Sequence, residues 1–463
     1  ERRDIIMKKI ISMLLACAVA LTSLAACGSA PVVEPNSPAS TPVADTPGSE
    51  PANQPDEPTA SDGLQVSPLS NLQELIPGMD LALSASSLSG NEDLSPLGNL
   101  SFNLYGQTDG AKSLKNNVFS PISAAIALGM LYEGTNGETA NELESVIGWS
   151  KSDALDLFNA LMYEYAGINS QTDTTLNLAN AAFFSPRLKN PDDATIIILR
   201  DGYRAQMFHG ELSTDSAREF INSWVSEKTE GEIPSVLGEN LDPSTVMVLI
   251  NTILLDAKWA RPFINYGVEI TMPFTCANGE TAELPCLADT RNMSYIDTEE
   301  LTGAIMDYSD GRLKFMAVKP KDGDISKLME KLDYSYFTSA LASAREGNCY
   351  FLMPKFSIES EIDLNDCVKE LGAKLIFDPD NADLTGFGES DNGNVFVSEI
   401  FQKAKIDVDE EGTRAAAATM VIANDACAIM EIKEIKLDSS FFWCVYDGET
   451  NLPLFMGVMT GNE

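Results

Sequence analysis

One long segment near the C-terminus alternates between apolar and charged positions. Within residues 395–409, five apolar side chains share one parity and four charged side chains share the other. Successive side chains of a strand point to opposite faces, so this alternation predicts a long strand with one buried face. The apolar positions are Phe396, Ile400, Ala404, Ile406 and Val408, and the charged positions are Lys403, Lys405, Asp407 and Asp409.

Apolar residues at helical spacing predict two helices. The first opens at Ser120-Pro121, with the serine as cap and the proline in the first turn, and ends at Gly134. The second covers Leu364 to Leu371 and closes at Gly372. Residues 441–446 and 454–459 predict a terminal hairpin. Because helix and strand signals mix without a regular βαβ alternation, the sequence indicates an α+β fold.

Composition narrows the possible partners. The chain has 463 residues, 44% of them apolar, which is enough to bury a substantial core. Its net charge is −38, from 69 acidic and 31 basic residues. Nucleic acids, heparin and anionic membrane surfaces are negatively charged and are bound by positively charged protein surfaces. The net negative charge of this chain therefore argues against all three as partners.

The N-terminal segment has the pattern of an export signal. Met7, the expected true start, precedes two lysines, an apolar run too short to span a bilayer comfortably, and small residues before Cys27. This pattern resembles the lipobox of bacterial lipoproteins. It implies a signal peptide over residues 1–26 and lipidation at Cys27, so the mature chain is expected to be exported and held at the cell surface by a lipid anchor.

Residues 27–95 are expected to form a disordered tether. The first part is rich in Pro, Ser, Thr and acids and has almost no large apolar side chain, so burial cannot offset its conformational entropy. The later part, from residue 64, has scattered leucines and is assigned to the end of the tether. The globular domain is expected to cover residues 96–463.

The usual signatures of catalysis and metal binding are missing from the sequence. The single histidine, His209, lies near no nucleophile motif. The sequence contains no Walker-type phosphate loop and no GxGxxG motif that follows a strand. The cysteines show no CxxC spacing, which disfavours a zinc site; Cys276 and Cys286 are either paired or free buried thiols. We therefore expect neither an enzyme nor a cofactor.

The predicted strand leads into the segment Glu410-Glu411-Gly412-Thr413-Arg414, which is followed by four alanines and Thr419. Alanine buries little apolar area, so the segment packs weakly by itself. Such a run suits a loop that slides into a narrow slot between packed strands. On one parity, all side chains from residue 413 to 423 are small or apolar, as an inward face requires.

These residues resemble the serpin family, and the resemblance covers about residues 97–461. It is carried by this hinge segment and by five strings that follow the family's order: Asn117-Val118-Phe119-Ser120-Pro121-Ile122-Ser123; Ile221-Asn222-Ser223-Trp224-Val225; Leu249-Ile250-Asn251 through Trp259; Met353-Pro354-Lys355-Phe356; and Pro453-Leu454-Phe455-Met456-Gly457.

The resemblance implies three β-sheets surrounded by about nine helices, with an exposed reactive-centre loop. It implies irreversible inhibition of a serine protease, or of a cysteine protease, which cuts the loop and stays acylated while the loop inserts into the central sheet. The alternative is a non-inhibitory surface protein of the same fold that is cut without trapping the protease.

Residue by residue, the resemblance places the hinge at Glu410, Gly412, Thr413, Ala415, Ala417 and Thr419. It places the contacts that control sheet opening at Ser120, Ser123, Asn251, Trp259 and Gln402. Two positions depart from the family. Gln402 stands where a histidine is usual and cannot titrate. Arg414 replaces an acid, on the parity that is expected to stay in solvent.

Counting from Glu410 places the reactive bond at Ala426–Cys427, although it could lie elsewhere within residues 425–430. Ala426 would suit an elastase-like or subtilisin-like pocket. Cys427 is interpreted as a small tolerated residue rather than a redox handle.

Overall fold

The computed structural model describes residues 71–77, 88, 90, 92–264, 268–390, 394–413 and 432–461. The chain divides into two units, and all of these residues belong to the second, Gln65–Glu463. No helix within the described ranges is long and apolar enough to cross a membrane.

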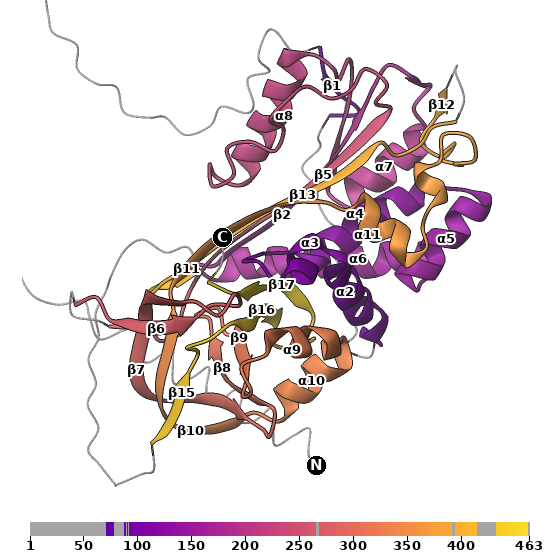
Figure 1. The fold of residues 1–463 in the computed structure, drawn as a ribbon. Helices are drawn as coiled ribbons and strands as arrows, with labels where there is room; N and C mark the ends of the chain where they lie inside the picture. The colour runs from indigo at the N-terminus through magenta and orange to yellow at the C-terminus, as the bar shows by residue number, and fades with distance from the viewer. Residues whose placement is uncertain are drawn as a thin grey trace, which may run out of the picture. The chain divides into compact units, whose positions relative to one another are not determined.

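A mixed seven-stranded sheet is the central element of this unit (Figure 1). Its pairing is partly parallel and partly antiparallel. In spatial order its strands are β1 (Gln73–Glu74), β4 (Ala205–His209), β2 (Thr175–Phe184), β5 (Met247–Lys258), β14 (Gly412–Thr413), β13 (Glu399–Val408) and β11 (Phe356–Asp363).

An eight-stranded sheet and a two-stranded sheet complete the β-structure of the described residues. The larger runs β15 (Lys433–Lys436), β10 (Arg345–Pro354), β7 (Thr281–Asp297), β8 (Leu301–Asp307), β9 (Leu313–Pro320), β16 (Phe441–Asp447) and β17 (Pro453–Met459), with β6 (Thr271–Thr275) paired to β7. The smaller pairs β12 (Glu389–Ser390) with β3 (Leu188–Lys189).

Ten α-helices and one short 3₁₀ helix, η1 (Leu375–Phe377), are described around these sheets. The α-helices are α2 (Ser95–Gln107), α3 (Asp109–Ser113), α4 (Pro121–Glu133), α5 (Gly137–Ile147), α6 (Lys151–Gln171), α7 (Asp193–Gly202), α8 (Asp215–Lys228), α9 (Ile325–Lys331), α10 (Tyr334–Ala342) and α11 (Asn365–Leu371). Twelve of the thirteen residues of α4 are buried, because this helix packs behind the central sheet with neighbours on every side.

Strand β5 is covered on both faces, which explains its continuous apolar sequence. Val248 and Ile250 belong to a small apolar cluster with α8, while Leu249 and Ile253 belong to the main core on the opposite face. Figure 1 shows α8 along one side of the central sheet and α4 on the other. The α+β class and the three sheets are therefore confirmed.

The predicted elements are present with shifted boundaries. The alternating strand is β13, which begins at Glu399 rather than at residue 395 and buries alternate side chains as expected. The hairpin β16–β17 and the helix ending at Gly372 are confirmed. Ser120 occupies the N-cap position of α4 and is fully buried, but its side chain makes no cap hydrogen bond.

The tether prediction is wrong around residue 73. Strand β1 pairs with β4, and Leu72 is 3% exposed in the α8 cluster, so this segment belongs to the folded unit. A two-residue strand is too short to show a period of its own in the sequence. Cys276 and Cys286 are free and buried rather than paired. His209 is a partly buried residue of β4, and its Nε2 lies 3.0 Å from the carbonyl oxygen of Leu188.

Candidate functional site

The hinge residues turn back into the central sheet directly after β13. Val408 faces Thr413, so β14 returns antiparallel to β13 and lies between it and β5. The carboxylate of Asp409 holds the turn by accepting hydrogen bonds from the backbone N–H groups of Glu411 and Gly412, at 2.8 and 3.1 Å. Partial burial raises the pKa of Asp409.

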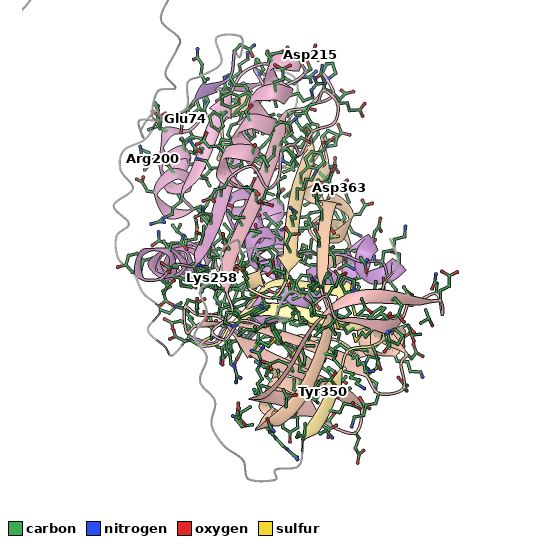
Figure 2. All side chains as sticks on the ribbon, turned by 90° about the vertical axis from the view of Figure 1, so that its left-hand side faces the viewer. Glu74, Arg200, Asp215, Lys258, Tyr350 and Asp363 are labelled. Atoms are coloured by element: carbon green, nitrogen blue, oxygen red, sulfur yellow. The ribbon has the colours of Figure 1, made fainter. Side chains whose placement is uncertain are left out.

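Gly412 is required by a close approach of two backbones. A Cβ at this position would lie 2.1 Å from the carbonyl oxygen of Ala257 on β5. Gly412 faces Lys258, which marks this end of β5 in Figure 2. A side chain at position 412 would therefore push the hinge out of the sheet.

Thr413 confirms the inward parity that the sequence predicted. Its side chain is 1% exposed, and its Oγ1 shares a hydrogen bond of 2.5 Å with the hydroxyl of Tyr308. Burial raises the pKa of Tyr308 well above its usual range. The first residue of the loop to enter the sheet is thus already anchored in the core.

Trp259 also holds the hinge in place through contacts with Asp409, Glu411 and Tyr308. Its indole Nε1 donates to the carbonyl oxygen of Asp409 at 2.9 Å, and its ring stacks on Tyr308 with centroids 4.6 Å apart. Its backbone N–H donates to the carbonyl oxygen of Glu411. Lys355 forms an ion pair with Glu410 at 3.0 Å. Of these partners, Tyr308 had no signal in the sequence, whereas Lys355 lies in one of the recognised strings.

Beyond the hinge, the central sheet contains a short stretch where β5 and β13 do not pair with each other, which we call the slot. Farther along, β5 and β13 pair directly and in parallel, from Val248–Glu399 to Thr252–Lys403. Within the described residues, positions 253–256 of β5 and 404–407 of β13 have no pairing with each other. The slot opens toward the α8 side, where its lining includes Leu254, Lys405 and the segment that follows α8.

Where the two strands meet, the predicted opening-control residues come together. Gln402 is fully buried; its side-chain oxygen accepts from the backbone N–H of Ser120 at 2.9 Å, and its amide donates to the Ser120 carbonyl at 2.8 Å. Gln402 also faces Asn251 across the strands. The glutamine therefore satisfies both backbone groups at the start of α4, the contact expected of the family's histidine.

Several buried oxygens beside this contact lack a partner. The Asn251 amide donates to the side-chain oxygen of Asn180, a residue that the sequence analysis missed because a buried asparagine inside a strand leaves no pattern. Among the buried side-chain oxygens of the described residues that have no hydrogen-bond partner, four belong to residues of this region: Oγ of Ser120 and Ser123, Oδ1 of Asn251, and Oγ1 of Thr252. Burying a polar atom without a hydrogen-bond partner costs free energy, so the junction of β5 with β13 is an unfavourable place in the native sheet.

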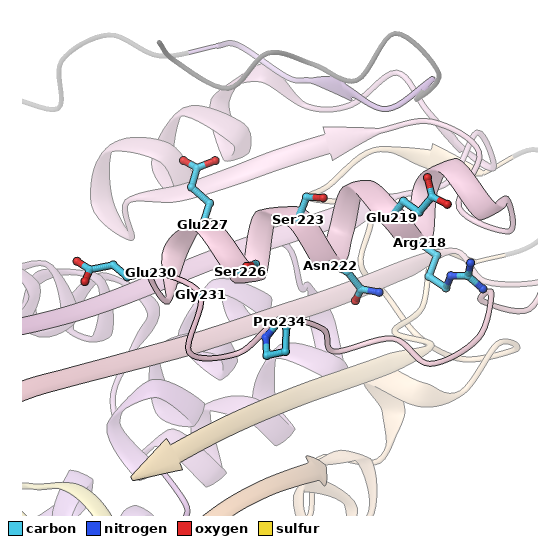
Figure 3. Close-up of a pocket in the computed structure, with 9 residues that line it drawn as sticks. All are labelled: Arg218, Glu219, Asn222, Ser223, Ser226, Glu227, Glu230, Gly231 and Pro234. Carbon is cyan, nitrogen blue, oxygen red and sulfur yellow. The ribbon is translucent and has the colours of Figure 1, made fainter. Parts of the chain in front are cut away.

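The segment after α8 covers the front of the slot. Lys405 forms an ion pair with Glu232 at 2.7 Å, and Lys403 donates to the carbonyl oxygen of Ser235 at 2.9 Å. An open hollow of about 790 Å³ lies between α8 and this segment. Figure 3 shows the residues that line it. Inside it, Asn222 binds backbone groups of Val236 and Leu237, so the hollow is the outer side of a structural contact.

The rest of the predicted site lies outside the described residues. This holds for the hinge positions Ala415, Ala417 and Thr419, for the reactive bond Ala426–Cys427, and for the lipidation site Cys27.

The fold and the hinge define an α+β protein whose central sheet is open between β5 and β13 over part of their length, with the short strand β14 paired to both at one end. The family model of serpins, described as serine protease inhibitors, matches residues 96–461. The chain belongs to the serpin family. Protease inhibition is the general function that this membership supports.

Individual relatives agree with this assignment. An uncharacterised serpin-like protein of Thermococcus kodakarensis is 30% identical over 372 residues, covering 78% of this chain and 84% of that protein. The leukocyte elastase inhibitor of Xenopus laevis is 29% identical over 369 residues, covering 77% and 96%. The native structure of tengpin, a thermophilic serpin, aligns with a TM-score of 0.74 at 28% identity, covering 81% and 97%. Thyroxine-binding globulin, solved with thyroxine, aligns at 0.69 and 26%, covering 80% and 99%.

Proposed function

We propose that this protein inhibits serine proteases irreversibly, by inserting its cleaved reactive-centre loop into the slot between β5 and β13. One observation carries the proposal: β14 already occupies the first two positions of an additional strand. The inserted strand continues from Thr413, and the target protease stays acylated at the cut end of the loop.

The strand pairings support one register for the proposed insertion. Lys403 faces Thr252, an offset of 403 − 252 = 151; Val408 and Ala257 both face Thr413, and 408 − 257 = 151. Because the offset is unchanged across the slot, β5 and β13 remain in register on both sides of it. Residues 414–422 would then lie between positions 256–248 of β5 and 407–399 of β13.

The loop is long enough for this movement. A strand advances about 3.3 Å per residue, so the thirteen steps from Thr413 to Ala426 span roughly 43 Å. This length would carry an attached protease from one end of the sheet to the other.

We further propose an elastase-like or subtilisin-like target. Ala426 is a small residue at the expected reactive bond. One of the relatives carries the name leukocyte elastase inhibitor. A cysteine protease remains an alternative covalent target.

The test is incubation of the folded unit with elastase, subtilisin and trypsin, followed by denaturing electrophoresis. A covalent complex supports trapping, and mass spectrometry of the released C-terminal peptide locates the bond. Cleavage without any complex across a broad protease panel would contradict the proposal.

The second candidate is a binding protein that is cut without trapping. The structural likeness to thyroxine-binding globulin favours it. The melting temperature before and after loop cleavage separates the two candidates, because insertion adds a central strand and raises the melting temperature, whereas cleavage without insertion does not.

We also propose that the chain is exported and lipid-anchored through Cys27, as its N-terminal pattern indicates. The test is the mass of the mature N-terminal peptide from cells, compared with that of Cys27→Ala. An unmodified Cys27 in the membrane fraction would contradict this localisation.

A further inference from the structure

Arg204 is an unpaired cation in a strongly acidic chain, which has 69 acidic residues and 31 basic ones. In the part of the chain that the structure describes, its guanidinium makes no hydrogen bond and no ion pair, and its Nε is buried. Burial lowers the pKa of Arg204. A buried polar group without a partner is rare in folded proteins, so this arginine favours a role in binding a group from outside the chain.

The backbone at this position is strained as well. Arg204 directly follows Tyr203, the C-terminal cap of α7, and has a φ of +50°, in the left-handed region that favours glycine. Six described residues other than glycine have a positive φ, and Arg204 alone among them also has a buried polar side-chain atom without a partner. Strained residues of this kind occur mainly at functional sites.

Arg204 lines an open hollow of about 470 Å³ between β2, the start of β4 and the end of α8, which we call the edge hollow. Strand β4 begins at Ala205, which pairs with Asn180 of β2. Residues 175–179 of β2 are therefore not paired with β4. The hollow lies where this edge of β2 is left without a neighbouring strand.

The unpaired edge of β2 offers backbone groups to the edge hollow. The side chain of Asn169 on α6 binds the N–H and the C=O of Leu176, at 2.7 and 3.0 Å, so these two groups point away from β5. Because a strand has a period of two residues, the N–H and C=O of Leu178 point the same way. Leu178 also lines the edge hollow, which thus presents a backbone donor together with the guanidinium of Arg204.

Charge favours the edge hollow over a second hollow, of about 540 Å³, that Arg204 also lines. Three acids and three bases line the edge hollow, whereas three acids and two bases line the second one. In the edge hollow, Gln206 donates to Glu74 at 3.0 Å, and Glu227 pairs with Lys228 at 3.6 Å. Because these acids remain nearby, a ligand with one negative charge suits the hollow better than a doubly charged one.

We propose that the edge hollow binds the carboxylate of a small organic molecule, which pairs with the guanidinium of Arg204 and accepts a hydrogen bond from the backbone N–H of Leu178. A guanidinium presents a fork of donors that matches a carboxylate. Ala179 and Trp224, two apolar residues that line the hollow, would contact the apolar part of the molecule. The inference goes beyond the proposed function and does not depend on it.

The test measures the binding of octanoate, a carboxylate with an apolar chain, to the full chain by titration calorimetry and by melting temperature. Octanoate should bind the unmodified protein and raise its melting temperature, because a ligand of the native form stabilises it. Arg204→Gln should weaken this binding by about 10- to 100-fold, through the loss of one hydrogen-bonded ion pair. Octanol lacks the charge and inorganic phosphate lacks the apolar chain, so both should bind more weakly than octanoate.

Arg200→Gln is the matched control. Arg200, labelled in Figure 2, lines the same hollow, but its Nε and Nη2 donate to the carboxylate of Asp201 at 2.7 and 2.9 Å. This variant loses the same charge while Arg204 stays in place. Its affinity for octanoate should therefore remain within about fivefold of that of the unmodified protein.

Arg204→Gly separates a binding role from a structural one. Glycine adopts the left-handed conformation without strain, so this variant should melt at the same temperature as the unmodified protein or higher when no ligand is present. It should nevertheless lose the binding of octanoate. If Arg204 serves the fold instead, the variant should melt at a lower temperature.

Five results would overturn the site. The first two are an absence of octanoate binding to the unmodified protein at millimolar concentration, and equal binding by the unmodified protein and Arg204→Gln. A loss in Arg200→Gln as large as that in Arg204→Gln would reduce the effect to general charge. Octanol or phosphate binding as tightly as octanoate would contradict a singly charged carboxylate as the ligand. A lower melting temperature of ligand-free Arg204→Gly would assign the arginine to the fold.

Discussion

A single charge placed on either face of the inserting strand gives the sharpest test of the register. Position 417 would lie opposite Ile253 and Ala404, which are 1% and 0% exposed in the core. Position 416 would lie opposite Leu254 and Lys405 on the front face, where Lys405 is partly exposed. The variants Ala417→Asp and Ala416→Asp therefore carry the same change on neighbouring residues but differ in the face that receives it.

The expected magnitudes are far apart. An uncompensated buried charge costs about 3–5 kcal/mol. At 1.4 kcal/mol per tenfold change, this disfavours insertion of the Ala417→Asp loop by about 100- to several-thousand-fold. The Ala416→Asp carboxylate would lie beside the partly exposed cation Lys405 instead of being left uncompensated in the core, so its effect should be much smaller, on the order of 1 kcal/mol.

The assay is the rise in melting temperature when the loop is cleaved, together with the ratio of covalent complex to cleaved protein for a protease that the unmodified chain traps. Ala416→Asp should behave like the unmodified protein, and Ala417→Asp should lose the rise and accumulate as cleaved product. Equal behaviour of the two variants, in a chain whose unmodified form shows the rise, would refute the register.

Three further predictions concern the native hinge and the junction of β5 with β13. Gln402→Ala leaves the backbone N–H of Ser120 unpaired, while the Ser120 carbonyl keeps its hydrogen bond from the N–H of Ala124, so the free energy of unfolding in urea should fall by about 1–3 kcal/mol. Unchanged stability would contradict the bridging role. Gly412→Ala places a Cβ against the carbonyl oxygen of Ala257 and should displace β14 from the sheet. The expected result is faster amide hydrogen exchange at positions 412 and 413. Unchanged protection from exchange would show instead that the strands can separate enough to accept the methyl group. Burial raises the pKa of Asp409, so its contribution to stability is fully present below the ordinary value of 3.8 and lost as pH rises through the raised pKa. Asparagine cannot ionise, so Asp409→Asn does not lose stability as pH rises through this window. The melting temperature of the variant minus that of the unmodified protein should therefore increase with pH. A difference that stays constant with pH would argue against the raised pKa of Asp409.

The sequence predicted those parts of the site that follow from the two-residue period of a strand. The parity of β13 and of Thr413 follows from period 2 alone, because only one face of this strand meets the core. The positions of Ser120, Asn251 and Gln402 came from the resemblance, and the structure brings all three together at one junction. Local pattern and family resemblance were sufficient for these residues because Asn251 and Gln402 lie in long strands, Ser120 directly precedes a long helix, and Thr413 follows β13 after a short turn.

The remaining features depend on contacts between distant segments. Nothing in the local sequence shows that β14 is inserted, since insertion is decided by the distance between β5 and β13. Gly412 was expected at the pivot for its backbone freedom, but it is needed because the carbonyl oxygen of Ala257 passes so close. Strand β1 was missed because two paired residues and one buried leucine carry no periodic signal.

The junction of β5 with β13 links the native fold to the proposed insertion. In the described residues, Oδ1 of Asn251 is buried without a partner, although both the oxygen and the nitrogen of the Gln402 side chain across the strands bind Ser120. In the proposed insertion, the register would set position 419 opposite Asn251 and Gln402. A threonine hydroxyl can donate one hydrogen bond and accept others, so it can supply what the asparagine oxygen lacks without disturbing the glutamine. The inserted strand would thus bring a polar group to the place where the native sheet has an unmet acceptor and small side chains to the core face of the slot.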